Sequence, residues 1–193
     1  MPKIISLISF FLLVITGFAQ PDTALSKRLD EYIRLNKELK FEELMEYIHP
    51  SLFKLAPKDQ LIEVFKKIYD NEEMKISIDN LEKRSISDLY TLNGVQYHKV
   101  DYYMVMRMKF KDESKTLDSS FVNGMTTSLE AALPKKKVSY DAAGNQFFIK
   151  GTDVLMAIKD SPKSSWLFLG YDPGNEMIKQ LLPKELIEHF NLQ

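Results

Sequence analysis

The chain has 193 residues, 45% of them apolar and 27% charged, which is the composition of one globular domain and argues against disorder. Lys3 is the only charged residue among the first 19, which leaves 26 − 1 = 25 basic and 27 acidic side chains in residues 20–193. This near balance gives no electrostatic reason to expect nucleic acid or an anionic membrane as a partner. The absence of cysteine excludes disulfides and thiolate metal sites.

The first 19 residues have the pattern of a secretory signal peptide. Lys3 gives a short positive start, residues 4–15 are apolar, and Gly17 and Ala19 place small residues at the cleavage-determining positions. We expect cleavage after Ala19, leaving residues 20–193 as a single domain. The apolar run is shorter than the roughly 20 residues of a membrane span, and no second one follows. The sequence therefore predicts a secreted or periplasmic protein with no membrane span, and one that is not a lipoprotein.

Three amphipathic helices are predicted over residues 22–39, 41–48 and 57–70, because apolar side chains recur there at spacings of three and four. The pair His49–Pro50 ends the second helix, since a residue before proline is disfavoured in the α region. Pro57 suits the first position of the third helix. The short connections indicate that the three helices pack as neighbours.

From Met74 the apolar period changes to alternation, which predicts a half-exposed strand. A turn at Asn93–Gly94 precedes the longest strand, residues 95–109, whose even positions form the apolar face. Further along, the patterns predict a short helix, then strands, then a C-terminal helical segment. Their ranges are 125–133 for the helix, 138–141, 146–159 and 166–169 for the strands, and 176–190 for the last segment.

Helices clustered before strands indicate an α+β fold, with one antiparallel sheet covered on one face by the helices. A short helix ending in HPSLF (residues 49–53) and long strands ending in SSWLFLGYDP (residues 164–173) carry a resemblance. Over residues 22–172 the chain resembles the nuclear transport factor 2-like superfamily, and within it small secreted bacterial members with no assigned activity. The resemblance implies a curved, cone-like sheet, and the helix at 125–133 and the C-terminal segment are additions to that minimal fold.

Many enzymes of this superfamily place an Asp, His or Tyr inside the cone, which makes His98, Tyr102 and Asp153 the candidate catalytic residues. His98 lies on the apolar face beside Tyr102, where it lines a pocket or, more simply, is a core histidine. Asp101 is three positions from His98, so in a regular strand the two face opposite sides and form no dyad. Asp153 shares its face with apolar residues. Either it borders a pocket, or the strand bends at Gly151 and turns it outward, which is the interpretation we favour.

Met104, Met106 and Phe148 are candidates to line an apolar ligand site, although flexible methionines are most simply core-filling residues. The run Lys135–Lys137 is interpreted as a solvated strand edge. The three histidines show no metal-ligand spacing, and no glycine-rich phosphate loop is present, so neither a metal nor a cofactor is expected.

The leading functional hypothesis is an exported, non-catalytic domain that binds a small apolar ligand or a protein partner in or on the cone. The alternative is a small isomerase, dehydratase or hydrolase that uses His98 or Asp153 inside the cone. A third reading is a structural module that forms a homodimer through its sheet.

Overall fold

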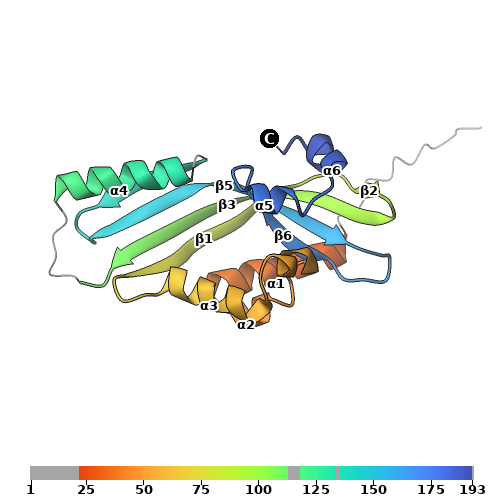
Figure 1. The fold of residues 1–193 in the computed structure, drawn as a ribbon, viewed down its shortest axis with the longest axis horizontal. Helices are drawn as coiled ribbons and strands as arrows, with labels where there is room; N and C mark the ends of the chain where they lie inside the picture. Colours follow the sequence, from red (N-terminus) through yellow and green to blue (C-terminus); the bar gives the residue numbers. More distant parts are fainter. Residues whose placement is uncertain (1–21, 113–117, 134, 193) are drawn as a thin grey trace, which may run out of the picture.

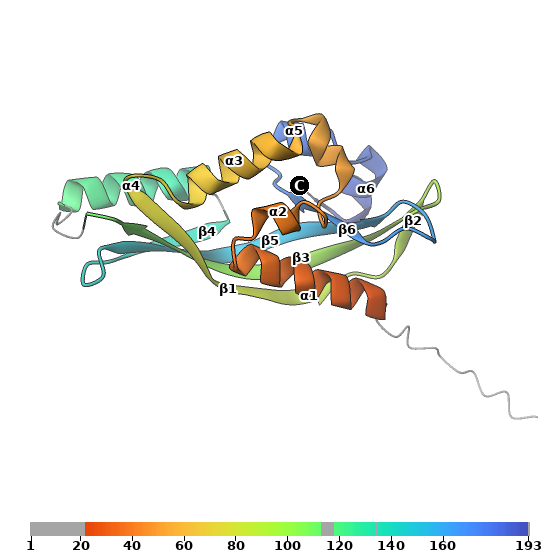
Figure 2. The same ribbon diagram turned by 90° about the horizontal axis from the view of Figure 1, so that it is seen from below.

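The computed structural model describes residues 22–112, 118–133 and 135–192, which form an α+β fold around a curved, open antiparallel sheet (Figure 1). Helices α1 (Thr23–Lys37), α2 (Phe41–Leu44) and α3 (Lys58–Tyr69) precede the strands, with a 3-10 turn, η1 (Pro50–Lys54), between α2 and α3. They follow one another across one side of the sheet (Figure 2). The predicted fold class, with N-terminal helices packed on a curved sheet, is confirmed. The predicted signal peptide, residues 1–19, lies outside the described residues.

The sheet is built around two long central strands, β3 (Val95–Phe110) and β5 (Gln146–Lys159), which pair along almost their whole length. β1 (Met74–Ile86) pairs with the outer side of β3, and β4 (Lys136–Asp141) with the outer side of β5. The short strands β2 (Tyr90–Leu92) and β6 (Leu167–Tyr171) extend the other end of the sheet, β2 against β3 and β6 against β5. All these pairings are antiparallel.

One face of the sheet carries two separate helical covers. Val100 pairs with Leu155, and Met108 with Phe147, in a register without a shift, so these four side chains share one pleated face. Val100 and Leu155 pack under α1, whereas Met108 and Phe147 pack under α4 (Ser119–Ala132). Because long strands twist, the two ends of this face point in different directions. In Figure 1, α4 accordingly lies above the sheet and α1 below it.

Among the described residues, helices cover the opposite face only at its β2 and β6 end, where α5 (Glu176–Lys179) and α6 (Lys184–His189) lie. Tyr97, at an odd position of β3, is buried there together with Met156 and Leu186. The Tyr171 hydroxyl donates a hydrogen bond of 2.6 Å to the carbonyl oxygen of Leu192, which fixes the end of the described chain on β6. The C-terminal segment therefore buries Tyr97, whereas the other odd positions of β3 are half-buried.

Local signals explain most element boundaries. Asn93 and Gly94 have positive φ angles of 51° and 82°, as the two central positions of a type I′ hairpin turn require, and they join β2 to β3. Helix α4 begins at Ser119 rather than at residue 125, because the Asp118 side chain accepts a hydrogen bond from the Phe121 amide and caps the helix. Pro183 divides the predicted C-terminal helical segment into α5 and α6.

Candidate functional site

The outer edge of β5 is interrupted between its two short neighbours. β4 pairs with β5 as far as Lys136 opposite Gly151, and β6 pairs with it from Tyr171 opposite Val154. In the part of the chain that the structure describes, no strand therefore lies beside Thr152 and Asp153 on this edge. A depression of about 800 Å³ opens at this gap, and we call it the notch. Its size lies within the range of roughly 300–1,000 Å³ that is usual for small-molecule sites.

The notch is lined from several elements at once: β3, β4 and β5, the C-terminal end of α4, the turn after β6, and the C-terminal residues after α6. Because the sheet edge is open at the gap, lining side chains come from both faces of the sheet. The larger apolar groups of the lining are Tyr102, Tyr103, Met104, Met106, Leu133, Val154, Tyr171 and Leu192. The lining surface is more apolar than polar, although eight charged side chains, five lysines and three aspartates, contribute to it.

Lys136 closes the inner end of the notch. Its ammonium group forms an ion pair with Asp153 and donates a hydrogen bond of 3.2 Å to the carbonyl oxygen of Thr152. The lysine side chain is only 5% exposed and the aspartate side chain 29%. A charge so far removed from water requires a partner, because an unpaired ion in the interior is costly. The lysine thus satisfies both the carboxylate and a backbone carbonyl that the missing strand leaves unpaired.

Gly151 allows the Lys136 side chain to take this path. A Cβ atom at residue 151 would lie 2.5 Å from the carbonyl oxygen of Lys135 and 2.7 Å from Cδ of Lys136. Two sequence-based interpretations need correction here. β5 does not bend at Gly151 to release Asp153, since its register with β3 is continuous, and Asp153 stays on its face because Lys136 neutralises it. Lys136 itself is buried rather than a solvated edge lysine.

Tyr102 completes this polar group from the neighbouring strand. It lies opposite Asp153 in the β3–β5 register, close enough for the Asp153 carboxylate to influence the pKa of its phenol. Burial is the main cause that raises the pKa of the Tyr102 phenol well above its usual value, and the nearby Tyr32 hydroxyl and Asp153 carboxylate act in the same direction. The phenol therefore stays protonated. Tyr102, Asp153 and Lys136 lie together, and we call them the polar cluster.

A second, smaller cavity of about 140 Å³ lies between α1, α3 and the sheet, which is the interior of the predicted cone. Leu29, Tyr32 and Tyr69 face it from the helices, and Tyr102 and Met104 line both this cavity and the notch. Burial raises the pKa of Tyr32 to about 12, so its phenol is protonated at neutral pH. A cavity of this size holds a molecule no larger than about benzene. The larger binding volume lies outside the cone, on the other side of Tyr102.

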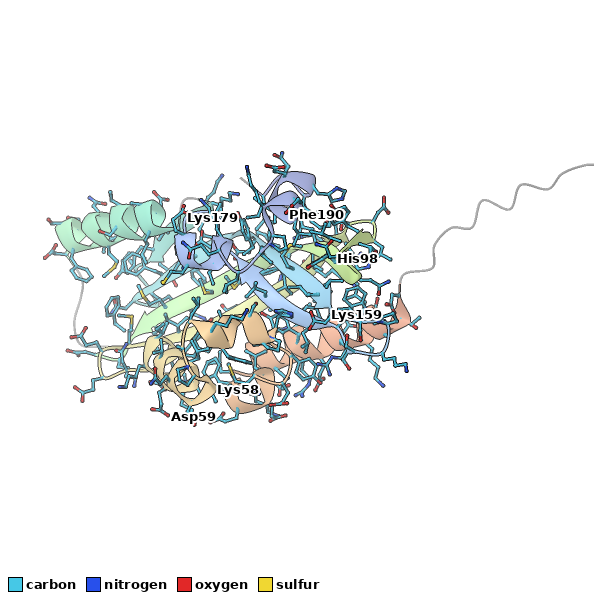
Figure 3. All side chains as sticks on the ribbon, turned by 45° about the vertical axis from the view of Figure 1, so that its right-hand side comes forward. Lys58, Asp59, His98, Lys159, Lys179 and Phe190 are labelled. Carbon is cyan, nitrogen blue, oxygen red and sulfur yellow. The ribbon has the colours of Figure 1, made fainter. Side chains whose placement is uncertain are left out.

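The structure brings Tyr102 and Asp153 together but places His98 elsewhere. His98 pairs with Ala157, four residues along β5 from Asp153, a separation of about 13 Å along the strand. Its Nδ1 atom lies 2.8 Å from the carbonyl oxygen of Ser87, and its ring packs against Trp166 at 5.1 Å between ring centroids. Figure 3 places His98 beside Lys159, at the end of the strands. His98 lines neither cavity.

The three predicted apolar lining residues are also divided. Met104 and Met106 line the notch. Phe148 lies on the opposite pleated face of β5, outside the notch lining, and the Lys150 ammonium lies 5.3 Å from the centroid of its ring. The two methionines and Phe148 therefore do not contribute to one surface.

Sequence reasoning missed the two residues that shape the inner end of the notch, Lys136 and Gly151. The sequence did contain a signal for a buried ion pair. Asp153 occupies an apolar position two residues after Gly151, and the lysine run lies at the start of a neighbouring strand. What the sequence lacked was the register that puts Lys136 opposite Gly151.

The charged groups of the polar cluster pair with each other. The Lys136 ammonium pairs with the Asp153 carboxylate, and Tyr102 lies opposite this carboxylate on the neighbouring strand. Within residues 22–112, 118–133 and 135–192, no group of three or more His, Cys, Asp or Glu side chains is arranged to hold a metal ion. The cluster therefore provides a fixed polar end to an apolar hollow.

No known protein family matches this chain, and no curated protein is significantly similar to it. None of the helices in the described part of the chain is long and apolar enough to cross a membrane.

Proposed function

We propose that this protein is an exported, non-catalytic domain that binds a small, largely apolar molecule in the notch. The observation that carries the proposal is a hollow of about 800 Å³ whose lining surface is more apolar than polar, and in which Lys136 pairs with Asp153. Concave, mostly apolar pockets with few polar groups are the usual form of small-molecule sites. The curved sheet under N-terminal helices supports the resemblance to the nuclear transport factor 2-like superfamily, which is part of the proposal.

Export is the cellular part of the proposal and rests on the pattern of residues 1–19. Mass spectrometry of the protein isolated from the periplasm or the medium tests it. A mature chain that begins at Gln20 is the expected result, and an intact N-terminus on protein retained in the cytoplasm would contradict it.

Binding is tested with the neutral apolar dye Nile red, whose fluorescence rises in an apolar environment. We expect saturable binding to the wild-type protein. Thr152 is exposed at the gap and lines the notch, so Thr152→Trp places a large side chain in the hollow without disturbing the core. This variant should weaken dye binding at least about tenfold, equivalent to roughly 1.4 kcal/mol.

Thr91→Trp is the matched control, because Thr91 is an exposed strand threonine on β2, outside the notch lining. It should bind the dye like the wild type. Equal binding by both tryptophan variants would place the dye elsewhere and would remove the notch as the site.

The contact between Tyr102 and Asp153 keeps one alternative in view, a small isomerase, dehydratase or hydrolase that uses this aspartate. Such an enzyme needs a titratable group within hydrogen-bond reach of its substrate. A screen with carbonyl and ester substrates tests it. Turnover by the wild type that is lost in Asp153→Asn, with dye binding retained, would favour the enzyme over the binding domain.

A further inference from the structure

Two lysines face each other across neighbouring strands at the rim of the notch. Lys137 on β4 and Lys150 on β5 are directly opposite in the strand register, and both line the notch. Like charges in directly opposed positions destabilise a strand pair. Within the described ranges neither lysine forms an ion pair with a carboxylate. The protein therefore presents two cationic side chains from directly opposite strand positions. The Lys150 ammonium lies 5.3 Å from the centroid of the Phe148 ring, and no carboxylate of the described residues pairs with either lysine.

The acidic residues of the notch are already engaged. Five lysines and three aspartates line it: Lys99, Lys135, Lys136, Lys137, Lys150, Asp101, Asp153 and Asp172. Asp153 pairs with Lys136, and Asp101 pairs with Lys99 at 3.3 Å and accepts a hydrogen bond from Ser85. Asp172 accepts a hydrogen bond from the Gly174 amide. The positive surplus therefore falls on the opposed lysines and on Lys135.

Protection of a sheet edge does not account for this arrangement. Lysines on an edge strand discourage pairing with another chain, which is sufficient reason for Lys137 on β4. Lys150 is different, because at this position β5 lies between β3 and β4 and has no free edge. Its neighbour on β3 is the uncharged Val105.

An apolar strip leads away from the two lysines on the same pleated face. Thr152 and Val154 follow Lys150 at alternate positions of β5, and Tyr103 lies opposite Thr152 on β3. Lys150 and Val154 are four residues apart, about 13 Å along the strand. Tyr103 and Val154 are half-buried and both line the notch. The two lysines thus lie at one end of a largely apolar strip that is about 13 Å long.

From this juxtaposition, and resting on the proposed binding function, we infer that the notch takes a small carboxylic acid with an apolar body. The carboxylate lies between the ammonium groups of Lys137 and Lys150, and the body lies along Tyr103 and Val154. An anion in this position relieves the repulsion between the lysines and forms charge-assisted hydrogen bonds, which are stronger than neutral ones.

The test compares decanoate with decanol, which share an apolar chain and differ in the anionic group. Each is titrated against the Nile red complex and, in parallel, by calorimetry against the free protein. On the wild type we expect decanoate to bind about tenfold more tightly than decanol at low ionic strength, and this preference to shrink as salt is added. In Lys150→Met, decanoate affinity should fall by about five- to tenfold, with decanol affinity unchanged within about twofold.

Lys75→Met is the matched control, since Lys75 is an exposed strand lysine on the same pleated face but outside the notch. It should keep the full preference for decanoate. Equal affinities of decanoate and decanol on the wild type would overturn the carboxylate inference and leave the binding function standing. If neither compound produced heat nor displaced the dye, the carboxylate inference would also be overturned, whereas the binding function is overturned only if Nile red fails to bind or binds Thr152→Trp as it binds the wild type.

Discussion

The two helix-covered ends of one sheet face differ in how their helices are held. Helix α1 buries Leu25, Leu29 and Leu35, and polar contacts also hold it at its N-terminal end. Asp22 accepts a hydrogen bond of 2.7 Å from the Trp166 indole, and Arg28 donates to the Trp166 carbonyl oxygen at 3.1 Å. Helix α4 buries none of its residues completely. It rests on the sheet through partly buried apolar side chains, Val122, Met125 and Leu129.

The difference shows that two helices packed on the same sheet face need not be equally stable. Packing that excludes water completely, with polar contacts at the helix end, makes α1 part of the core. Helix α4 packs only through half-buried side chains, and we call it the lighter cover because a helix packed in this way unfolds locally before the rest of the protein. The notch lies beside the lighter cover, with Ala132 and Leu133 at the end of α4 in its wall.

The largest expected effect compares matched leucines in the two covers. Leu29→Ala in α1 removes a side chain with 0% exposure and should lower the free energy of unfolding by about 2–5 kcal/mol. Leu129→Ala in α4 removes a half-buried side chain and should cost about 1 kcal/mol or less. Urea denaturation followed by circular dichroism measures both values. Equal losses would mean that the two covers are equally important to the fold.

An intermediate loss of stability is expected for a substitution at Gly151, which lies on β5 between the two helix-covered ends. In Gly151→Ala the new Cβ meets the Lys135 carbonyl oxygen and the Lys136 side chain, so β4 must shift, at a cost of about 1–3 kcal/mol. Gly170→Ala is the control, because a Cβ there meets nothing within 4 Å. It should leave stability unchanged or raise it slightly. A loss in the control as large as that in Gly151→Ala would show that space around Lys136 is not the cause.

The smallest effect concerns the polar anchor of α1 and depends on pH. Partial burial of Asp22 acts to raise the pKa of its carboxyl group, but hydrogen bonds from Trp166, Leu25 and Ala24 outweigh it, and the pKa is lowered. The folded state therefore gains stability above the unfolded pKa of about 3.9, and this gain is lost as the pH falls through the folded value.

Asp22→Ala should accordingly destabilise the protein by about 1 kcal/mol at neutral pH, with the difference from wild type shrinking below about pH 4. Asp22→Asn keeps a side chain that caps the helix and removes the titrating group. Its stability relative to Asp22→Ala should not depend on pH. Unfolding free energies measured from pH 7 downward check both statements, and a pH-independent difference between wild type and Asp22→Ala would contradict the role of the charge.

Sequence periodicity predicted the long elements well, because their apolar patterns extend over many residues. The strand at Gln146–Lys159 has the predicted bounds, and α3 starts and ends within one residue of them. β2 was not predicted, since three residues carry no measurable alternation. The start of α4 was placed too late, although Asp118 is a residue type that commonly caps helices.

The candidate site was less predictable, because it depends on contacts between distant segments. Periodicity placed Tyr102 and Asp153 on apolar faces but not opposite each other. The burial of Lys136 follows from the β4–β5 register and from the space at Gly151, neither of which appears in a local pattern. The notch itself arises where two strands stop short of each other on one edge, and strand ends are the boundaries that local patterns define least well.

Trp166 is the only tryptophan in the chain, is 2% exposed, and contacts α1 through Asp22 and Arg28. Its emission spectrum therefore reports on one end of the molecule alone. Undocking of α1 would shift the emission to longer wavelength, whereas melting of α4 would leave it unchanged and would appear only as lost helical ellipticity. Trp166 is thus an intrinsic fluorescent probe of the α1 end. A difference between the unfolding midpoints measured by fluorescence and by circular dichroism would show how independently α4 unfolds.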